Sequence, residues 1–276
     1  MSEVSSPSES TIALLGAGNM GQAILRGLVS SKTVSPDRIF VTTRRPERAE
    51  ELASEWGVRA AASNLEAVEA SDAVVLAVKP QILHGVVLEV RGSLRHKLTI
   101  SVAAGVSTAR LEGWLDVPAR VIRAMPNTPA SIGQGATALA RGTYAHDEDL
   151  SLAEALFRSV GRTAVVDEEH LDAVTGLSGS GPAYVFLIIE AFADAGVKVG
   201  LSREVAQELA TQTIKGAAQL LLESGEHPGR LKDRVTSPGG TAIAGLHVLE
   251  AGGLRTTIMD AVEAAARRAK ELGDRG

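Results

Sequence analysis

A glycine-rich hexapeptide near the start of the chain carries the first chemical signal. Gly16-Ala17-Gly18-Asn19-Met20-Gly21 directly follows the apolar run Ile12–Leu15. A strand that ends in G-x-G-x-x-G and opens a helix directs backbone N–H groups and the positive helix end toward a pyrophosphate. The hexapeptide therefore predicts a dinucleotide bound between a strand at 11–15 and a helix at 19–29.

The segment that follows the next predicted strand, Arg38–Thr42, indicates which dinucleotide binds. NAD enzymes usually carry Asp or Glu there to bind the ribose 2′-hydroxyl, whereas this chain has Thr43-Arg44-Arg45. Two guanidinium groups and a hydroxyl suit a 2′-phosphate, because they form charge-assisted hydrogen bonds. We therefore expect NADPH, with NADH as a weaker alternative. The other interpretation is a solvated turn before the helix that Pro46 starts.

The elements that must hold these residues alternate along the first part of the chain. Strand-like runs recur at 11–15, 38–42, 73–78, 98–102, 120–124, 136–140 and 163–166. Helical patterns separate the earlier ones, at 19–29, 46–56, 63–69, 81–91 and 107–114, with Gly57 as a stop signal and Ser107 as an N-cap. The alternation predicts the α/β class, with a Rossmann-type, doubly wound and mostly parallel sheet.

The rest of the chain is helical in pattern. Helices are expected at 182–195, 202–224, 241–250 and 254–272, separated by clusters of Gly, Pro and Ser. With 276 residues the chain is long enough for two domains. We expect a disordered lead-in at 1–10, a dinucleotide-binding Rossmann domain at 11–167, and an all-helical domain for substrate binding and dimerisation at 168–276.

One helical segment predicts the oligomeric state. Tyr184–Ile189 is apolar on almost every side, so its helix must be buried. A helical domain of this size offers little interior, and burial against a second copy is the simplest solution. The segment therefore predicts a homodimer through the C-terminal helices.

Composition excludes several classes of protein. The formal net charge of −5 gives no case for nucleic acid or an anionic membrane surface, and the absence of cysteine excludes disulfides and thiolate metal sites. The six histidines are scattered, and only His247 with Glu250 forms a close helical pair, so no metal site is expected. No apolar stretch reaches the roughly 18 residues of a spanning helix, and the first residues do not resemble a signal peptide. We expect a soluble, cytoplasmic protein.

Three motifs follow predicted strands, where ligands bind in such sheets. Val78-Lys79-Pro80 ends the third strand, and Pro80 keeps Lys79 extended. We expect Lys79 to face the nicotinamide or to line the substrate entrance; the alternative is a lysine at the end of a strand in solvent. Val102–Gly105 ends the fourth strand with small residues, against which a flat ring can lie. In the rigid loop Met125–Pro129, Asn127 binds a nicotinamide carboxamide or a substrate carboxylate, unless the loop is purely structural.

Two glycine and hydroxyl loops open helices in the second half of the chain. Leu177–Tyr184 contains Ser178 and Ser180 between glycines, and Val235–Thr241 repeats the arrangement. A glycine turn at a helix start exposes consecutive N–H donors, which bind a carboxylate as readily as a phosphate. Although glycines are ordinary in helix–helix turns, two such loops in one small domain favour an anion site.

The motifs together resemble a known family. Gly16-x-Gly18-x-x-Gly21, Val78–Pro80, Met125–Pro129, Gly176–Tyr184 and Ser237–Gly240 follow one another as they do in the Δ1-pyrroline-5-carboxylate reductases, and the resemblance covers the chain from Thr11 onward. It implies NAD(P)H-dependent reduction of the cyclic imine 1-pyrroline-5-carboxylate to L-proline, the last step of proline biosynthesis. It also implies a homodimer, or a larger oligomer such as a decamer, built on the helical domain.

The resemblance implies a set of site residues. Besides the glycine loop, Thr43, Arg44 and Arg45, the nucleotide would be lined by Asn64, Ala77, Val78, Lys79, Pro80, Ala103, Ala104, Gly105 and Asn127. The substrate would be held by Glu168, Ser178, Ser180, Ser237, Gly239, Gly240, Thr241 and Ala242, with Thr241 and Lys79 as catalytic residues. In the family the loop at 237–240 comes from the partner subunit.

One departure and two alternatives accompany this resemblance. Many relatives have threonine at the position of Ala242, so Thr241, water or solvent must supply the proton here. A β-hydroxyacid dehydrogenase or another imine reductase would share the two-domain build, but the first of these carries a catalytic lysine on the first long helix of its second domain. Tyr184–Ala195 contains none. A nucleotide-sensing regulator would not need both glycine and hydroxyl loops.

Overall fold

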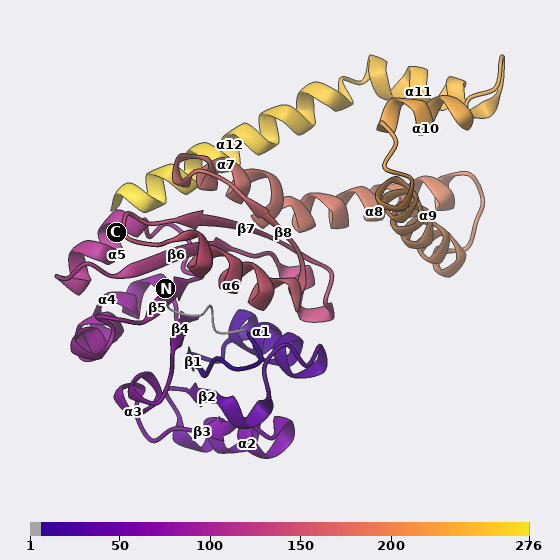
Figure 1. Cartoon of the computed structure of the whole chain (residues 1–276). Coiled ribbons are helices and arrows are strands. Elements are labelled where there is room, and N and C mark those ends of the chain that lie inside the picture. The colour runs from indigo at the N-terminus through magenta and orange to yellow at the C-terminus, as the bar shows by residue number, and fades with distance from the viewer. Residues whose placement is uncertain (1–6, 276) are drawn as a thin grey trace. The chain divides into compact units, whose positions relative to one another are not determined.

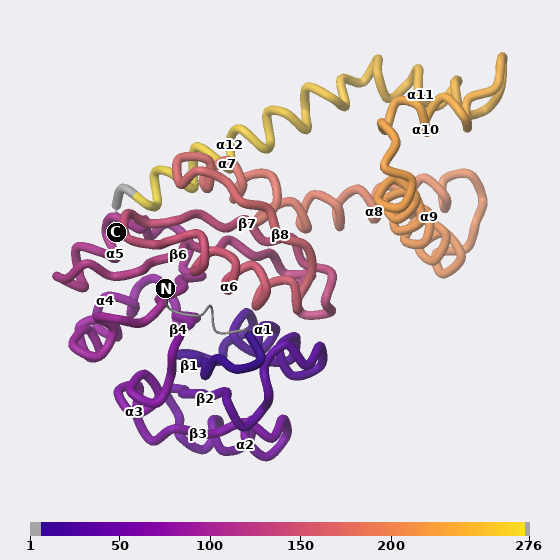
Figure 2. The backbone as a smooth tube through the Cα atoms, in the orientation of Figure 1, coloured from indigo at the N-terminus to yellow at the C-terminus, as the bar shows by residue number. Residues whose placement is uncertain are grey.

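The computed structural model describes residues 7–275 (Figures 1 and 2). The predicted disordered lead-in at 1–10 lies partly outside these residues. Within its described part, residues 7–9 form a turn and Ser10 is only 1% exposed. The packed chain therefore begins before the predicted boundary at Thr11.

A single eight-stranded sheet forms the centre of the first part of the chain. Its order is β3-β2-β1-β4-β5-β6-β7-β8. The strands are β1 (Ile12–Leu15), β2 (Ile39–Thr42), β3 (Arg59–Ala60), β4 (Ala73–Leu76), β5 (Leu98–Ser101), β6 (Arg120–Met125), β7 (Gly135–Arg141) and β8 (Gly161–Val165). All neighbouring pairs are parallel except β6 and β7. The prediction of a mostly parallel, doubly wound sheet is confirmed.

Helices cover both faces of this sheet. Buried side chains of α1 (Asn19–Ser30), α2 (Pro46–Trp56) and α6 (Asp147–Arg158) pack with Ile12 and Leu14 of β1 on one face. Those of α3 (Asn64–Glu69), α4 (Pro80–Val90) and α5 (Thr108–Leu115) pack with Ala13 and Leu15 on the other. Successive residues of a strand point to opposite faces, so one apolar strand serves two cores.

Local signals set most helix boundaries. Gly57 ends α2 with φ of 71°, and the Ser63 and Ser107 hydroxyls accept N–H bonds at the starts of α3 and α5. Pro46 and Pro80 occupy first helical positions. The sequence prediction omitted α6, although its acidic first turn and its apolar stripe are both visible in the printed sequence. It also omitted β3, which has only two residues and no apolar run.

The second part of the chain is helical. It contains α8 (Gly181–Lys198), α9 (Arg203–Ser224), α10 (Pro228–Arg234), α11 (Thr241–Ala251) and the first part of α12 (Leu254–Arg275). Small residues join α8 to α9: a Cβ on Gly196 would lie 2.8 Å from the Ala206 Cβ, and Ala193 is buried against the same helix. The short α10, which Pro228 starts, was not predicted.

The chain divides into two compact units, one comprising residues up to Ser180 together with Ala264–Gly276, and the other Gly181–Glu263. The domain boundary expected from the sequence, at residue 167, stays a prediction. In this division into units, the 3₁₀ turn η4 (Glu168–His170) and α7 (Leu171–Val174), which follow residue 167, belong to the first unit. There Leu171 is buried against Ala138 and Ala140 of β7.

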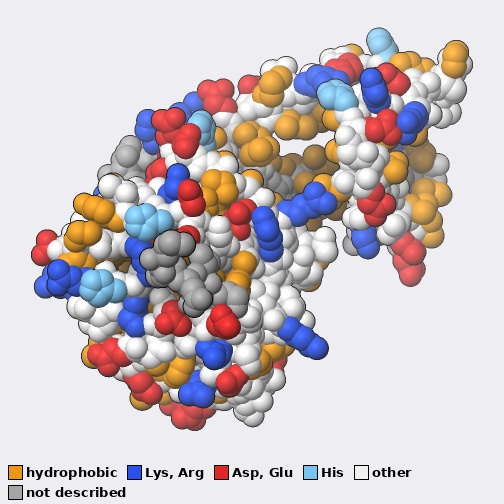
Figure 3. All heavy atoms as spheres, in the orientation of Figure 1, with side chains coloured by type: hydrophobic (Ala, Val, Ile, Leu, Met, Phe, Trp, Pro, Cys, Tyr) orange, Lys and Arg blue, Asp and Glu red, His pale blue; other side chains and the backbone are white. Residues whose placement is uncertain are grey.

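Apolar side chains remain exposed on the helical unit (Figure 3). Phe186 and Leu187 of α8 are 65% and 66% exposed, and α9 exposes Leu209 and Leu220. The helical run Glu168–Lys198 is long and apolar enough to span a membrane by length and composition alone, contrary to the sequence prediction. An apolar helix that packs against another copy of the chain passes the same test.

Candidate functional site

The fold requires two of the three glycines of the first motif but not the third. Gly16 has φ of 96°, and a Cβ there would lie 2.8 Å from the Val78 side chain. A Cβ on Gly21 would lie 2.2 Å from the Gly16 carbonyl oxygen. At Gly18 a Cβ would meet no atom within 4 Å, and φ of −70° suits any residue. The fold thus explains Gly16 and Gly21, whereas Gly18 borders open space.

That open space fits a pyrophosphate. Gly18 is the N-cap of α1 and makes no side-chain cap, so the first N–H groups of the helix lack such a partner. Ala17, Asn19 and Met20 complete the turn, and the Gln22 amide donates to the Ala17 carbonyl at 2.8 Å. Bare backbone at the positive end of a helix is the usual cradle of a dinucleotide phosphate.

The predicted 2′-phosphate site lies just beyond β2. Arg44 and Arg45 are exposed, and neither guanidinium forms an ion pair with any other residue of 7–275. The Thr43 hydroxyl donates to the Arg45 carbonyl, which fixes the turn before α2. Two unpaired guanidinium groups at this position are suited to binding a phosphate.

Asn64 adjoins this turn. The Thr42 hydroxyl donates to its Oδ1 at 2.7 Å, and its Nδ2 donates to the Glu89 carboxylate at 2.9 Å. Asn64 is therefore held at the end of β2 with a defined amide orientation. Glu89, on α4, was not predicted, because no local pattern connects it with a residue 25 positions away.

The predicted residues after β4 and β5 meet at one edge of the sheet, because the two strands are parallel. Ala77 and Val78 are half-buried there, and Lys79 is exposed and extended before Pro80, as predicted. Ala103 is buried, whereas Ala104 is exposed and Gly105 has φ of 74°. Thus a segment after each strand reaches the edge where dinucleotides bind.

A cleft of about 640 Å³ opens beside Pro80, Ala104 and Gly105. Its other walls, which the sequence analysis missed, include His84, Trp114 and Arg110. The rings of His84 and Trp114 lie 4.8 Å apart. In sequence these residues look like ordinary surface positions of two helices, so only the packing of α4 beside α5 identifies them.

The end of α12 closes one side of the loop that follows β5. The Arg110 guanidinium donates to the Gly273 carbonyl at 3.0 Å, and a Cβ on Gly105 would lie 3.4 Å from the Gly273 Cα. Figure 2 shows this end of the chain beside α5. The C-terminal helix therefore supports a predicted cofactor segment within the first unit.

Both polar atoms of the Asn127 side chain form hydrogen bonds with other residues of the protein. Its Oδ1 accepts the Ala136 N–H at 2.9 Å, and its Nδ2 lies 3.2 Å from both the carbonyl oxygen and the hydroxyl of Ser178. The amide thus joins the loop after β6 to the predicted hydroxyl motif. This geometry favours the structural interpretation of Asn127 over direct cofactor binding. Ser180 lies half-buried at the end of the same turn.

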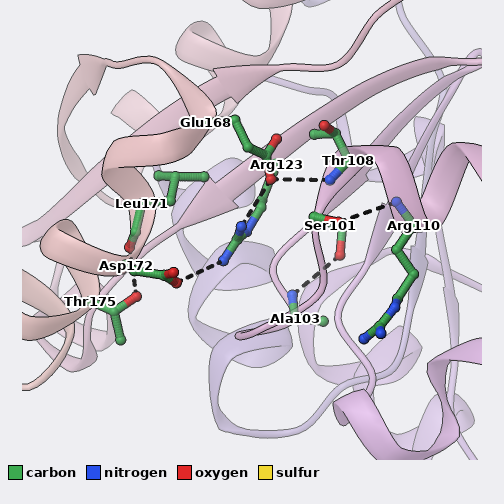
Figure 4. Close-up of polar contacts among 10 residues, drawn as sticks. Ser101, Ala103, Thr108, Arg110, Arg123, Glu168, Leu171, Asp172 and Thr175 are labelled. Carbon is green, nitrogen blue, oxygen red and sulfur yellow. Dashed lines mark hydrogen bonds and ion pairs between the residues drawn. The ribbon is translucent and has the colours of Figure 1, made fainter. Parts of the chain in front are cut away.

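Glu168 lies in a charged cluster rather than alone (Figure 4). Its Oε1 accepts from the Thr108 N–H at 3.1 Å and from Arg123 at 2.9 Å, and Arg123 also lies 3.9 Å from Asp172. The side chain of Arg123, on β6, is only 7% exposed, and that of Glu168 is 27% exposed. The Glu168 Oε2 is buried without a hydrogen-bond partner among the described residues.

The loop before α11 forms a second bare helix start, in the helical unit. The Gly240 N–H donates to the Ser237 carbonyl at 3.0 Å, and Gly239 has φ of 68°. A Cβ on Gly240 would lie 2.2 Å from the Ser237 hydroxyl oxygen, so only glycine lets this hydroxyl lie over the turn. Thr241 is exposed and Ala242 half-buried in the first turn of α11.

A cavity of about 570 Å³ borders Gly239 and Gly240, and Lys232 and His247 also line it. The free N–H groups of the first turn and the Ser237 hydroxyl together favour an anion. The Lys232 ammonium is paired with the Asp233 carboxylate at 2.9 Å, and Glu250 also lines the cavity. This donor set suits a small carboxylate.

Displaced pKa values occur at the opposite, amino edge of the sheet. A hydrogen bond from Ser35 lowers the pKa of Asp37, which precedes β2. Burial lowers the pKa of Lys97, which precedes β5, although the Asp72 and Glu69 carboxylates oppose the effect. Both groups belong to strand entrances and not to the candidate site.

Comparisons with known proteins agree with this geometry. The family model "Pyrroline-5-carboxylate reductase dimerisation" matches residues 168–272, and "NADP oxidoreductase coenzyme F420-dependent" matches residues 11–105. The chain is 47% identical to the pyrroline-5-carboxylate reductase of Arabidopsis thaliana over 268 residues, covering 96% of this chain and 97% of the relative. Identity to the enzyme of that name from Escherichia coli is 41% over 265 residues, covering 96% and 98%.

Solved structures extend the comparison to the fold. The pyrroline-5-carboxylate reductase of Coxiella burnetii superposes with a TM-score of 0.92 at 41% identity, covering 95% of this chain and 98% of that one. The Plasmodium falciparum enzyme with NADP bound gives 0.82 at 32% identity, covering 96% and 99%. An imine reductase from Streptomyces aurantiacus gives 0.55 at 16% identity, covering 96% and 93%, and shares only the fold. The chain belongs to the pyrroline-5-carboxylate reductase family.

Proposed function

We propose that this protein reduces 1-pyrroline-5-carboxylate to L-proline with NADPH, the last step of proline biosynthesis. Two bare helix starts carry the proposal: one at Gly18, open to a pyrophosphate, and one at Ser237–Gly240, suited to a carboxylate. An oxidoreductase that binds a dinucleotide and a small imino acid needs both. The relatives named above support this substrate.

The dinucleotide would lie along the carboxyl edge of the sheet, held at its pyrophosphate by the loop at 16–21. Arg44 and Arg45 would bind the 2′-phosphate, which favours NADPH over NADH. Ala77–Pro80 and Ala103–Gly105 would flank the nicotinamide end. When bound, NADPH supplies the hydride that the imine carbon accepts. The chain contributes orientation, from which most of the rate acceleration of such a transfer comes.

The imino acid would be anchored by its carboxylate. Ser237, Gly239 and Gly240 form the cradle, and Thr241 and Ala242 add N–H groups from the first turn of α11. With alanine at position 242, the Thr241 hydroxyl is the side-chain donor of this turn nearest to the cradle in sequence. We assign to Thr241, or to water beside it, the proton that the imine nitrogen requires.

Four further residues keep narrower roles. Lys79 is exposed at the start of α4, where its ammonium would attract anionic ligands. Glu168 would act through the cluster with Arg123, because one of its oxygens already accepts two hydrogen bonds. Ser178 and Ser180 lie near the start of the segment 168–272 that the dimerisation family model matches.

We propose a homodimer through the C-terminal helices, with the decamer as a possible higher assembly and the cytoplasm as the location. Exposed Phe186 and Leu187 on α8, inside the segment matched by the dimerisation model, support this. Transferring such side chains from water to an interface stabilises association by about 25 cal/mol per Å² of apolar surface. The partner subunit would then donate the cradle at 237–240 to each site.

The experiment that tests the function measures oxidation of NADPH, by the absorbance of its nicotinamide, with 1-pyrroline-5-carboxylate and with open-chain keto acids. We expect turnover with the cyclic imine and none with the keto acids. Reduction of keto acids alone would instead indicate a hydroxyacid dehydrogenase. Absence of any turnover with the imine would contradict the proposal.

Substitutions in the cradle test the carboxylate site. Removal of the hydroxyl in S237A should raise the KM for the imine about tenfold, because one hydrogen bond to a charged group is lost. The KM for NADPH should remain unchanged. The control is S151A, which removes an exposed hydroxyl on α6 that donates to the Asp147 carbonyl at 2.8 Å. Equal imine kinetics in the two variants would reject the cradle.

A further inference from the structure

The contact between Asn127 and Ser178 spans two motifs that are 51 residues apart. The Asn127 amide nitrogen lies 3.2 Å from both the Ser178 hydroxyl and the Ser178 carbonyl oxygen. The amide oxygen of Asn127 accepts the Ala136 N–H at 2.9 Å, so the side chain has one orientation. The nitrogen must therefore donate toward Ser178.

Ser178 lies in an unusual turn. Thr175–Gly179 forms a π-helix, in which the Ser180 N–H donates to the Thr175 carbonyl at 2.8 Å. A Cβ on Gly179 would lie 2.8 Å from the Met125 side chain, so the turn packs closely against the end of β6. Single π-turns within helices occur frequently at functional sites, where they change the direction of a side chain.

The donated hydrogen bond decides what the Ser178 hydroxyl can do. A serine hydroxyl has one O–H donor and two acceptor lone pairs. Because Asn127 donates to the oxygen, the O–H must point away from Asn127. Ser178 is half-buried, and its hydroxyl donates to no acceptor among residues 7–275. Its hydrogen is therefore available to a ligand.

We propose that Asn127 is a positioning residue, which acts through the π-turn to present the Ser178 hydroxyl as a hydrogen-bond donor to a ligand oxygen. The inference rests on the proposed function. Thr175, in the same turn, lines the 640 Å³ cleft beside Ala104 and Gly105. We expect the oxygen that accepts from Ser178 to belong either to the carboxamide of the nicotinamide or to the carboxylate of the imino acid.

The first test is S178A. Loss of one hydrogen bond should weaken binding of the affected ligand about three- to tenfold. Titration of NADP⁺ without imine, followed by the tryptophan fluorescence of Trp56 and Trp114, reports the nicotinamide arm. The KM for the imine reports the substrate arm. A change in the NADP⁺ dissociation constant supports the proposal and assigns the oxygen to the nicotinamide carboxamide. A change in the KM for the imine supports it and assigns the oxygen to the substrate carboxylate. Unchanged values in both arms overturn it.

The second test concerns Asn127. N127D keeps the shape and the bond from Ala136, but its carboxylate only accepts, so the Ser178 hydroxyl turns inward to donate to it. We expect N127D to reproduce the change seen in S178A. Adding N127D to S178A should change the same constant by less than twofold, because no hydroxyl remains to be directed. A merely structural role predicts instead that the two effects multiply, which would overturn the proposal.

Controls separate the possible failures. S131A removes a hydroxyl of the same loop region that donates to the Thr128 carbonyl at 3.0 Å, and it should leave both constants unchanged. N127A is made in parallel in case N127D does not fold. It frees the hydroxyl, so its effect should lie between those of wild type and S178A and vanish in the S178A background. If wild type fails to reduce the imine, the proposed function fails, whereas the NADP⁺ titration still tests the positioning role.

Discussion

Substitution of two glycines in the first motif separates the needs of the fold from those of the ligand. At Gly18 the φ of −70° suits alanine, and a Cβ would touch no atom within 4 Å. Replacing glycine by alanine in a compatible conformation stabilises a protein by about 0.4–1 kcal/mol through the unfolded state. Alanine is a poorer N-cap than glycine by a similar amount. The two effects offset, so G18A should leave the melting temperature within about 2 °C of wild type.

Gly21 is the matched contrast. A Cβ there would lie 2.2 Å from the Gly16 carbonyl oxygen, which is backbone and cannot rotate away. Such overpacking costs about 1–3 kcal/mol, so G21A should lower the melting temperature by several degrees. The two substitutions add the same single methyl group three residues apart. Any difference in stability or affinity between the two variants therefore reflects the surroundings of each glycine and not the group that was added.

The assay measures both variants in two ways. Thermal unfolding without nucleotide gives stability, and the KM for NADPH together with the NADP⁺ dissociation constant gives affinity. We expect G18A to lose at least tenfold in affinity, or about 1.4 kcal/mol, because its methyl group occupies the space of the pyrophosphate. Wild-type affinity in G18A, or melting as low as that of G21A, would refute the assignment of this space to the phosphates.

Three other predictions test charge. Replacing Arg44 and Arg45 together by alanine should lower the preference for NADPH over NADH about ten- to hundredfold, through lost charged hydrogen bonds, and an unchanged preference in parallel kinetics would contradict the 2′-phosphate site. The folded state binds fewer protons at Lys97 between its lowered pKa and the usual 10.5, so the free energy of unfolding should rise with pH across that window. In thermal melts at several pH values, K97M should show a smaller increase of the free energy of unfolding with pH. A pH dependence identical to that of wild type would contradict the role of Lys97. R123M should lower the free energy of unfolding by about 1–3 kcal/mol, a range reduced to allow for the partly exposed Glu168. Adding E168Q should restore part of this stability. Additive losses of stability in urea unfolding would contradict a coupled pair.

Much of the fold could be predicted because its signals are local. Apolar runs such as 73–76 locate the buried strands, and serine, proline and glycine mark helix ends at positions such as Ser107, Pro46 and Gly57. The antiparallel pairing of β6 with β7 could not be predicted in this way. An apolar strand has the same sequence pattern in either direction. Only the neighbouring strands of the sheet therefore determine whether its pairing is parallel or antiparallel.

In the candidate site, too, local features could be predicted from the sequence and long-range contacts could not. Glycine motifs could be found from sequence because each glycine answers a local need, such as the positive φ of Gly16 or the close approach at Gly240. Contacts such as Arg123 with Glu168 join residues 45 positions apart and leave no periodic trace. The family resemblance therefore implied that Glu168 binds the substrate, whereas the sequence analysis missed the arginine that holds it.

The two anion cradles use one physical device at different places in the chain. At both, glycine allows backbone N–H groups at a helix start to face a ligand without an intervening side chain. The first belongs to the unit that contains the sheet, and the second to the unit Gly181–Glu263. Neither cradle shares a residue with the other, so a substitution in one should leave binding of the other ligand alone unchanged. Coupling between them can then arise only when both ligands are bound, and a double-mutant cycle on G18A and S237A would measure it.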